Sequence, residues 1–256
     1  MDKTLRGAQY TMSDGHTLAT EVVNDEESHL CLYILLQDMF KVGDMVVGID
    51  IEWGFKSTSS SSSAAVSRSA SLSGRTIPLD SQTHHQQQQQ QPPPSASQPA
   101  ERKAVEQHAA LVTLCTKLGC VLIRMNPKQL PSLSPSLRKF LAIKEILFVG
   151  VHIREDLHRM KKLYGVIVRN AVELSDLAAK MNDHPRFLGM SARELCSKVC
   201  SIKLEQKPFV VLWSNWFDPT LSNEQLESAT TDAYAAYKTG RKMLEGGNSS
   251  VKRLFY

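Results

Sequence analysis

Two carboxylates stand two residues apart in an otherwise apolar stretch, "DMVVGIDIEWGF" at residues 44–55. Side chains at i and i+2 of an extended strand share one face, so Asp50 and Glu52 face one side and Ile49 and Ile51 the other. Two like charges on a mostly buried strand are costly unless a cation pairs with them. Because Mg²⁺ and Mn²⁺ prefer carboxylate oxygens, the pair indicates a divalent-metal site. An exposed strand end with two solvated acids is the open alternative.

Two further acids lie in segments with a helical pattern. Asp156 falls in the first turns of the helix that follows "EILFVGVH", where stabilisation of the helix dipole is the ordinary reason for an acid. Asp232 lies in the middle of the last predicted helix, and its neighbours are small: Ala229, Ala233, Ala235 and Ala236. Small residues let another element approach closely, so an acid on that face indicates either a partner or solvent.

The elements that must position these acids follow from periodicity and turn signals. Strands are predicted at residues 16–23, 45–53, 108–117, 119–125, 145–152 and 165–174. Helices are predicted at residues 25–40, 134–142, 154–165, 175–182, 191–200 and 222–244. Helix starts are marked by Ser134 before a proline and by the capping boxes Ser191/Glu194 and Ser222/Gln225. Three strands followed by alternating strands and helices predict a mixed α/β sheet.

Composition limits the class of protein. The 256 residues are 42% hydrophobic, and they contain no apolar run long enough for a membrane-spanning helix, so no membrane partner is expected. The N-terminal stretch lacks the apolar core of a secretory signal. Five cysteines, an odd number scattered through apolar segments, indicate reduced core thiols. We therefore expect an intracellular protein, in the nucleus rather than in the cytoplasm.

Residues 56–103 differ from the rest of the chain. They contain a serine tract, a glutamine tract and few large apolar side chains, so we predict a disordered Ser/Gln/Pro-rich insertion. It divides a single predicted domain made of residues 1–55 and 104–256. Five basic and two acidic residues in the insertion account for +3 of the formal net charge of +4. Bulk charge therefore does not require a nucleic-acid partner, and any such function must depend on a local site.

Three stretches carry a resemblance to a known family: "VVGIDIEW", "FVGVHIREDLHRMKKLYG" and "LSNEQLESATTDAYAAYKTGRKML". Their order and spacing resemble the three motifs of the DEDD superfamily of 3′–5′ exonucleases. The chain is most similar to the Werner-syndrome-type exonuclease domain in its short plant form, with ribonuclease D-like relatives. The stretches "LVTLCTKLGCVLIRM" and "LWSNW" also match, and the resemblance covers the chain outside the insertion.

The resemblance implies a ribonuclease H-like exonuclease fold, in which a five-stranded mixed sheet of three antiparallel and two parallel strands is flanked by helices. It assigns four acids that bind metal and catalyse: Asp50, Glu52, Asp156 and Asp232. Two ions, Mg²⁺ or Mn²⁺, would clamp an in-line displacement at phosphorus. The implied substrate is a DNA or RNA 3′ end, and the implied product is a nucleoside 5′-monophosphate. The choice between DNA and RNA stays open.

The third motif departs from the family pattern. The tyrosine subclass has Tyr four residues before the last Asp, where this chain has Ser228, and the histidine subclass has His five before, where this chain has Glu227. The group that orients the attacking water is therefore missing by either pattern, and Ser228 is interpreted as a degenerate position. Weakened activity is the implied result, because such a group contributes about 10²–10⁴-fold. Trp53, beside the first motif, is a candidate for stacking on a substrate base, with packing as the alternative.

Three classes of function compete on these grounds. The first is a metal-dependent 3′–5′ exonuclease. The second is a catalytically impaired nucleic-acid-binding module that retains the metal site. The third is a protein-interaction scaffold that contacts a partner through the insertion, and the four carboxylates favour the first two.

Overall fold

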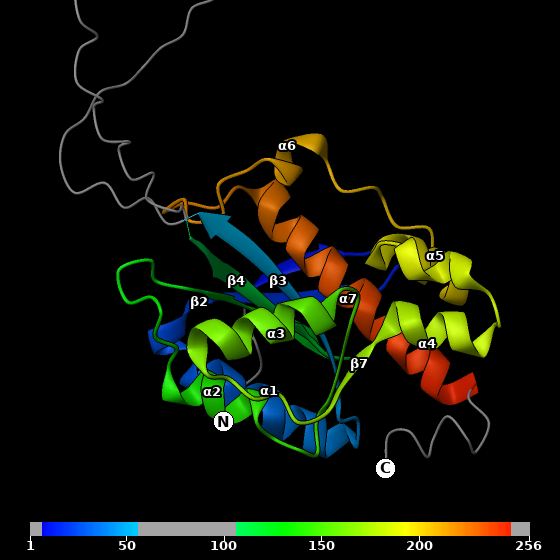
Figure 1. The fold of residues 1–256 in the computed structure, drawn as a ribbon, viewed down its shortest axis with the longest axis horizontal. Coiled ribbons are helices and arrows are strands. Elements are labelled where there is room, and N and C mark those ends of the chain that lie inside the picture. The colour runs from blue at the N-terminus through cyan, green and yellow to red at the C-terminus, as the bar shows by residue number, and fades with distance from the viewer. Residues whose placement is uncertain (1–6, 56–105, 247–256) are drawn as a thin grey trace, which may run out of the picture. The chain divides into compact units, whose positions relative to one another are not determined.

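Seven strands form one mixed sheet in the order β1-β2-β5-β4-β3-β6-β7 (Figure 1). The computed structural model describes residues 7–55 and 106–246. The strands are β1 (Ala8–Thr11), β2 (Thr17–Asn24), β3 (Val46–Phe55), β4 (Gln107–Cys115), β5 (Gly119–Arg124), β6 (Leu147–Gly150) and β7 (Ala171–Glu173). The insertion predicted at residues 56–103 lies outside the described residues.

Five of these strands form the sheet that the family resemblance implies. β3, β4 and β5 pair in antiparallel fashion, whereas β6 pairs with β3 and β7 with β6 in parallel. The prediction of a ribonuclease H-like mixed sheet is therefore confirmed. The sheet is larger than predicted, because β2 pairs in parallel with β5 and β1 forms a hairpin with β2. A four-residue strand such as β1 is too short to show a period of two in the sequence.

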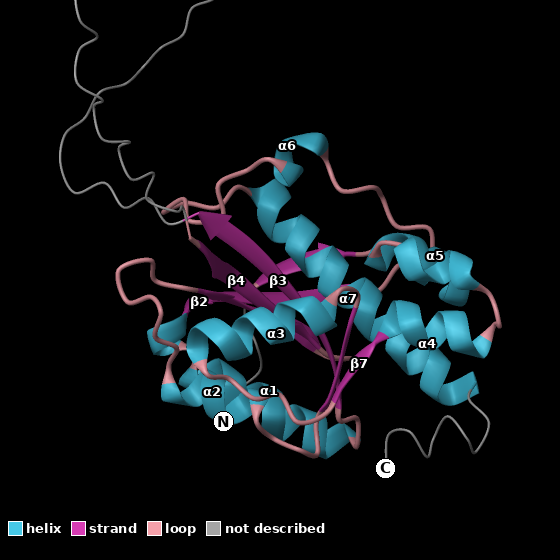
Figure 2. Ribbon diagram, in the orientation of Figure 1, coloured by secondary structure: helices cyan, strands magenta, loops and turns pink. Residues whose placement is uncertain are grey.

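Helices cover both faces of the sheet, as Figure 2 shows. The α-helices are α1 (His29–Val42), α2 (Pro135–Leu141), α3 (Ile153–Tyr164), α4 (Leu174–Met181), α5 (Ala192–Cys200), α6 (Phe209–Leu212) and α7 (Asn223–Gly246). Short 3₁₀ helices span Asp25–Glu27 and Pro185–Gly189. One apolar core joins the sheet to α4, α5 and α7, and a second joins its other face to α1, α2 and α3. Among the described helices, none is both long and apolar enough to cross a membrane.

The predicted helix starts are confirmed by their hydrogen bonds. The Ser134 hydroxyl accepts from the Leu137 N–H, and Ser191 and Glu194 form a reciprocal capping box. Ser222 and Gln225 bond each other in the same reciprocal way ahead of α7. These caps satisfy N–H groups that have no partner within the helix, so they fix where α2, α5 and α7 begin.

Some boundaries differ from the prediction. The predicted helix at 25–40 is a 3₁₀ turn followed by α1, and the predicted strand at 165–174 shortens to three residues. The helix α6 was not predicted, because four apolar residues after a proline carry no helical period. All five cysteines are free thiols, as predicted.

One close approach fixes the position of α7. Figure 1 shows α7, coloured orange to red, lying across β3, coloured cyan. A Cβ atom on Gly48 of β3 would lie 2.2 Å from the Ala233 carbonyl oxygen and 2.6 Å from the Tyr237 nitrogen. The missing side chain at Gly48 therefore lets the backbone of α7 contact β3 at Ala233, directly after Asp232.

Candidate functional site

The strand β3 presents Asp50 and Glu52 toward α7. Ile49 and Ile51 pack into the core shared with α1 and α2, so the alternating acids face the other side of the sheet. The ladder with β4 shifts register between Glu52 and Trp53, and such a bulge changes the direction of the strand. Asp50 and Glu52 therefore lie on the same face of β3, as the alternation in the sequence predicts, at the point where the regular pairing with β4 ends.

The helix α7 brings Asp232 to the same place. One carboxylate oxygen from each of Asp50, Glu52 and Asp232 lies within 4.8 Å of the others. These three side chains are called the carboxylate cluster from here on. Asp50 and Asp232 are far apart in the sequence, and the contact at Gly48 is what lets α7 approach β3 closely enough to join them.

Asp50 lacks a local partner. Its Oδ2 atom is buried and makes no hydrogen bond to any other described residue. Burial, and then the negative charges of Glu52 and Asp232, raise the pKa of Asp50 well above its ordinary value. A buried carboxylate oxygen without a donor is costly unless a cation binds it. The donor set, all carboxylate oxygen, suits Mg²⁺ or Mn²⁺, so the residues fit the metal that the family resemblance implies.

A lysine already contacts the cluster. The Lys207 ammonium donates to Glu52 Oε1 at 2.5 Å and lies 3.3 Å from Asp232 Oδ2. Burial lowers the pKa of Lys207, but the charges of Glu52 and Asp232 outweigh burial and raise it overall. Burial also raises the pKa of Glu52, against the opposing effect of Lys207. Lys207 is therefore a cation bound by two of the three clustered acids.

An arginine on α5 also binds Asp232, the acid that α7 contributes to the cluster. Arg193 is 5% exposed, and its Nε donates to Asp232 Oδ1 at 2.6 Å. Its other nitrogens donate to the Glu205 carbonyl at 2.7 Å and to the Ser228 carbonyl and hydroxyl at 3.0 and 2.8 Å. A guanidinium with four such bonds is fixed in position, so it fixes the orientation of the Asp232 carboxylate.

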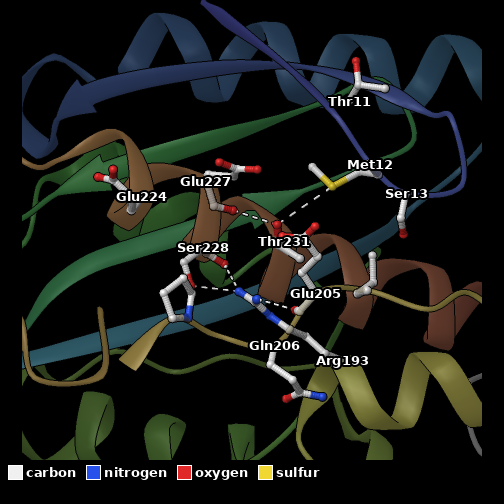
Figure 3. Close-up of a pocket in the computed structure, with 12 residues that line it drawn as sticks. Thr11, Met12, Ser13, Arg193, Glu205, Gln206, Glu224, Glu227, Ser228 and Thr231 are labelled. Carbon is white, nitrogen blue, oxygen red and sulfur yellow. Dashed lines mark hydrogen bonds between the residues drawn. The ribbon is translucent and has the colours of Figure 1, made fainter. Parts of the chain in front are cut away.

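Ser228 belongs to this arginine network. It is 3% exposed and stands four residues before Asp232, so both residues meet Arg193 from one side of α7. Ser228 and Arg193 line a pocket of about 220 Å³ between α7, the segment around Glu205 and the end of β1. Figure 3 shows the two side chains pointing toward each other. The acids of the carboxylate cluster do not line this pocket. The Ser228 hydroxyl therefore accepts a hydrogen bond from Arg193 and lies away from the carboxylate cluster's own contacts.

Asp156, the fourth predicted acid, is not in the cluster. It lies in the first turn of α3, and its Oδ1 accepts a hydrogen bond from Trp53 Nε1 at 2.7 Å. Burial raises the pKa of Asp156 to about 6, although the bond from Trp53 acts in the opposite direction. Its charge also contributes to the raised pKa of Asp50, so it lies near enough to act on the cluster.

Trp53 contacts Arg159 through its ring and Asp156 through its indole nitrogen. The Arg159 guanidinium stands 4.8 Å from the centre of the Trp53 ring, in addition to the bond from the indole to Asp156. Trp53 therefore orients Asp156 in this structure. Its predicted stacking on a substrate base stays a prediction.

Two residues of the site were not predicted. Arg193 and Lys207 contact acids 39 and 155 residues away in the sequence. Arg193 stands in the first turn of a capped helix, and Lys207 stands in the irregular segment at residues 201–208. Neither position carries a motif or a period that separates it from an ordinary surface residue.

The sequence of this chain is similar to those of known 3′–5′ exonucleases. A family model described as 3′–5′ exonuclease matches residues 98–246. The protein RISC-interacting clearing 3′-5′ exoribonuclease 1 of Arabidopsis thaliana is 31% identical over 126 residues, which are 49% of this chain and 61% of that protein. Human exonuclease 3′-5′ domain-containing protein 2 is 33% identical over 117 residues, 44% of this chain and 18% of that protein. The chain thus spans less than two thirds of either relative.

Solved structures give a weaker likeness. The EXD2 exonuclease domain soaked in Mn and Mg is 20% identical, with 92% of this chain and 93% of that chain covered and a TM-score of 0.38. Brucella melitensis NrnC is 18% identical, with 58% and 71% covered and a TM-score of 0.46.

Proposed function

Because the chain belongs to the 3′–5′ exonuclease family, we propose that its carboxylate cluster hydrolyses nucleic acid from the 3′ end. The reaction is metal-dependent, takes Mg²⁺ or Mn²⁺, and releases nucleoside 5′-monophosphates. Two ions are the number that the family resemblance implies. Asp50, Glu52 and Asp232 would hold metal directly, and Asp156 would complete the set from α3.

A single observation supports this proposal most strongly. Three carboxylates from two elements converge within 4.8 Å, and one of them keeps a buried oxygen without a hydrogen bond in the described structure. Lys207 and Arg193 pair with Glu52 and Asp232, but neither bonds the buried Oδ2 of Asp50. A buried carboxylate beside two like charges is costly unless a cation also binds it, and a divalent ion would supply that charge.

The site residues would have separate roles in holding metal and in positioning the acids. When bound, the divalent ions supply the charge that activates the attacking water and stabilises the departing 3′ oxygen. Asp50 and Glu52 are positioned by the pairing of β3 with β4, where they lie opposite Thr113 and Leu111. Arg193 fixes the Asp232 carboxylate through its Nε bond of 2.6 Å. Trp53 holds Asp156 through its indole nitrogen at 2.7 Å.

The test is an end-labelled substrate assay. The full chain is incubated with 3′-recessed DNA and with single-stranded RNA, in Mg²⁺, Mn²⁺ or EDTA. We expect 5′-monophosphates from the 3′ end with metal and none with EDTA or with the isosteric variant Asp50→Asn. Activity in EDTA, or activity retained by Asp50→Asn, would contradict the proposal. The two substrates also decide between DNA and RNA.

Ser228 supports a second candidate function. Its hydroxyl is buried against Arg193, so the structure offers no phenol or imidazole at the position from which the family orients water. The alternative is a catalytically impaired module that binds nucleic acid and retains the metal site. Metal-dependent binding of a labelled oligonucleotide, measured by fluorescence anisotropy, without detectable product would favour this alternative.

We also propose a subgroup within the family, a cellular location and a protein partner. Membership of the Werner-syndrome-type group within the family depends on the motif resemblance. A nuclear location is testable with a fluorescent fusion in cells. A protein partner that binds through residues 56–103 is testable by comparing captured proteins with and without that segment, which lies outside the described residues.

A further inference from the structure

Lys207 occupies the space where the carboxylate cluster would hold a cation. Its ammonium lies 2.5 Å from Glu52 Oε1 and 3.3 Å from Asp232 Oδ2, on oxygens of two of the three clustered acids. The side chains of Lys207, Glu52 and Asp232 are only 23%, 14% and 13% exposed. The contact is therefore shielded from solvent and is stronger than an ordinary surface pair.

One ammonium is an incomplete counter-ion for this cluster. It bonds Glu52 and approaches Asp232, but Asp50 Oδ2 remains buried without a hydrogen bond. A divalent ion brings twice the charge and shares its coordination among several oxygens. We propose that Lys207 is a resident counter-ion of the carboxylate cluster, and that a divalent ion displaces it from Glu52 and Asp232. This inference rests on the proposed metal site.

The two cations exclude each other for two reasons. Arg193 already binds Asp232 Oδ1, so Oδ2, which faces the ammonium, is the oxygen of that acid left for a metal. A divalent ion and an ammonium only a few ångström apart also repel each other strongly in a partly buried site. Occupancy by Lys207 and occupancy by metal are therefore alternatives at these two acids.

Displacement requires movement of one side chain. The backbone on the N-terminal side of Lys207 is anchored, because the Lys203 carbonyl accepts from Ser13 at 2.7 Å and the Glu205 carbonyl accepts from Arg193 at 2.7 Å. The Lys207 ammonium also stands 5.6 Å from the centre of the Trp216 ring, whose face attracts a cation. Rotation of the lysine stem moves the charge away while the segment stays in place.

The first experiment measures Mn²⁺ binding to the full chain by isothermal titration at fixed ionic strength. Lys207→Met keeps the length of the stem and removes the charge, so the metal no longer competes. We expect Mn²⁺ to bind about tenfold more tightly, a change of about 1.4 kcal/mol. Lys203→Met is the matched control, because Lys203 is exposed and lies four residues earlier in the same segment. It should bind Mn²⁺ as the wild type does.

The outcomes separate this inference from the proposed function. If the wild type binds Mn²⁺ and a folded Lys207→Met chain binds it no more tightly, Lys207 does not compete and only the inference fails. If neither chain binds Mn²⁺ at millimolar concentration, the proposed metal site fails and the inference fails with it. Tighter binding in Lys207→Met alone supports both.

A second experiment uses the wild-type chain and so does not depend on a variant that folds. An amine-acylating reagent is applied in EDTA and in saturating Mn²⁺, and the modification of each lysine is read by mass spectrometry. We expect Lys207 to be protected in EDTA and to react several-fold faster in Mn²⁺, while Lys203 reacts equally in both. Equal protection of Lys207 under both conditions would overturn the inference.

Discussion

Replacing Arg193 by methionine tests whether this arginine holds the Asp232 carboxylate in place. The variant keeps an unbranched apolar stem and removes the whole guanidinium. It deletes the bond to Asp232 at 2.6 Å, the bond to the Glu205 carbonyl at 2.7 Å and both bonds to Ser228. Four acceptors, three on α7 and one in segment 201–208, lose a donor in one step.

The size of the loss follows from burial. Removing one partner of a buried ion pair costs about 3–5 kcal/mol, because the remaining charge stays buried without compensation. Asp232 is 13% exposed and keeps Lys207 at 3.3 Å, so the lower end of that range applies. We expect a loss of about 3 kcal/mol. For a domain of this size, that corresponds to a fall in Tm of roughly 6–12 °C.

The assay is urea denaturation in EDTA with a matched surface control. Arg154 forms an ion pair with Asp176, but its side chain is 75% exposed. Exposed pairs contribute about 0–1 kcal/mol, so Arg154→Met should leave stability nearly unchanged. If Arg193→Met loses no more stability than Arg154→Met, the arginine network does not hold Asp232 and the reasoning is wrong.

Four further predictions follow from the fold and the site. Gly48→Ala should lower the free energy of unfolding by about 3 kcal/mol in thermal denaturation, because the new Cβ meets the backbone of α7 at 2.2 Å. Gly189→Ala is the control, because its Cβ enters open space and should leave stability unchanged. Asp50→Asn should raise the Tm in EDTA, since it removes a group whose ionised form is destabilised by burial and by Glu52 and Asp232, and should abolish the rise in Tm that Mn²⁺ gives the wild type; an unchanged Mn²⁺ effect would contradict this. Deleting residues 58–100 should leave the Tm and Mn²⁺ binding almost unchanged, and a large loss of stability would show that the segment packs on the domain. Ser228→Tyr should raise nuclease activity, approaching about 10²-fold, and the gain should vanish when Asp50→Ala is added; a folded, metal-binding variant no more active than wild type would show that more than this residue has been lost.

The sequence was informative where a pattern is local. Alternation on β3 placed Asp50 and Glu52 on one face, and the capping residues Ser134 and Ser191 marked the starts of their helices. The family motifs implied a sheet with three antiparallel and two parallel strands. Each of these signals lies within a few residues of the feature that it predicts.

The cations of the site could not be predicted in this way. Arg193 and Lys207 act on acids 39 and 155 residues away, and only the packing of α5 and of segment 201–208 against α7 and β3 brings them there. The contact of Asp156 is equally non-local. The Trp53 indole, 103 residues earlier in the sequence, donates to its carboxylate, and no spacing rule indicates that bond.

The pairing of β3 with β4 has a consequence for how this protein can vary. Phe55 and Gln107 are partners in the ladder, so the chain leaves the sheet and returns to it at one point. For the disordered segment predicted between them, the entropy of closing the loop grows only with the logarithm of its length. Each doubling therefore costs about 0.6 kcal/mol. On that prediction, the glutamine tract can lengthen or shorten by many residues at almost no cost to the sheet, and we expect the number of glutamines to differ among close relatives while the acids on β3 stay where they are.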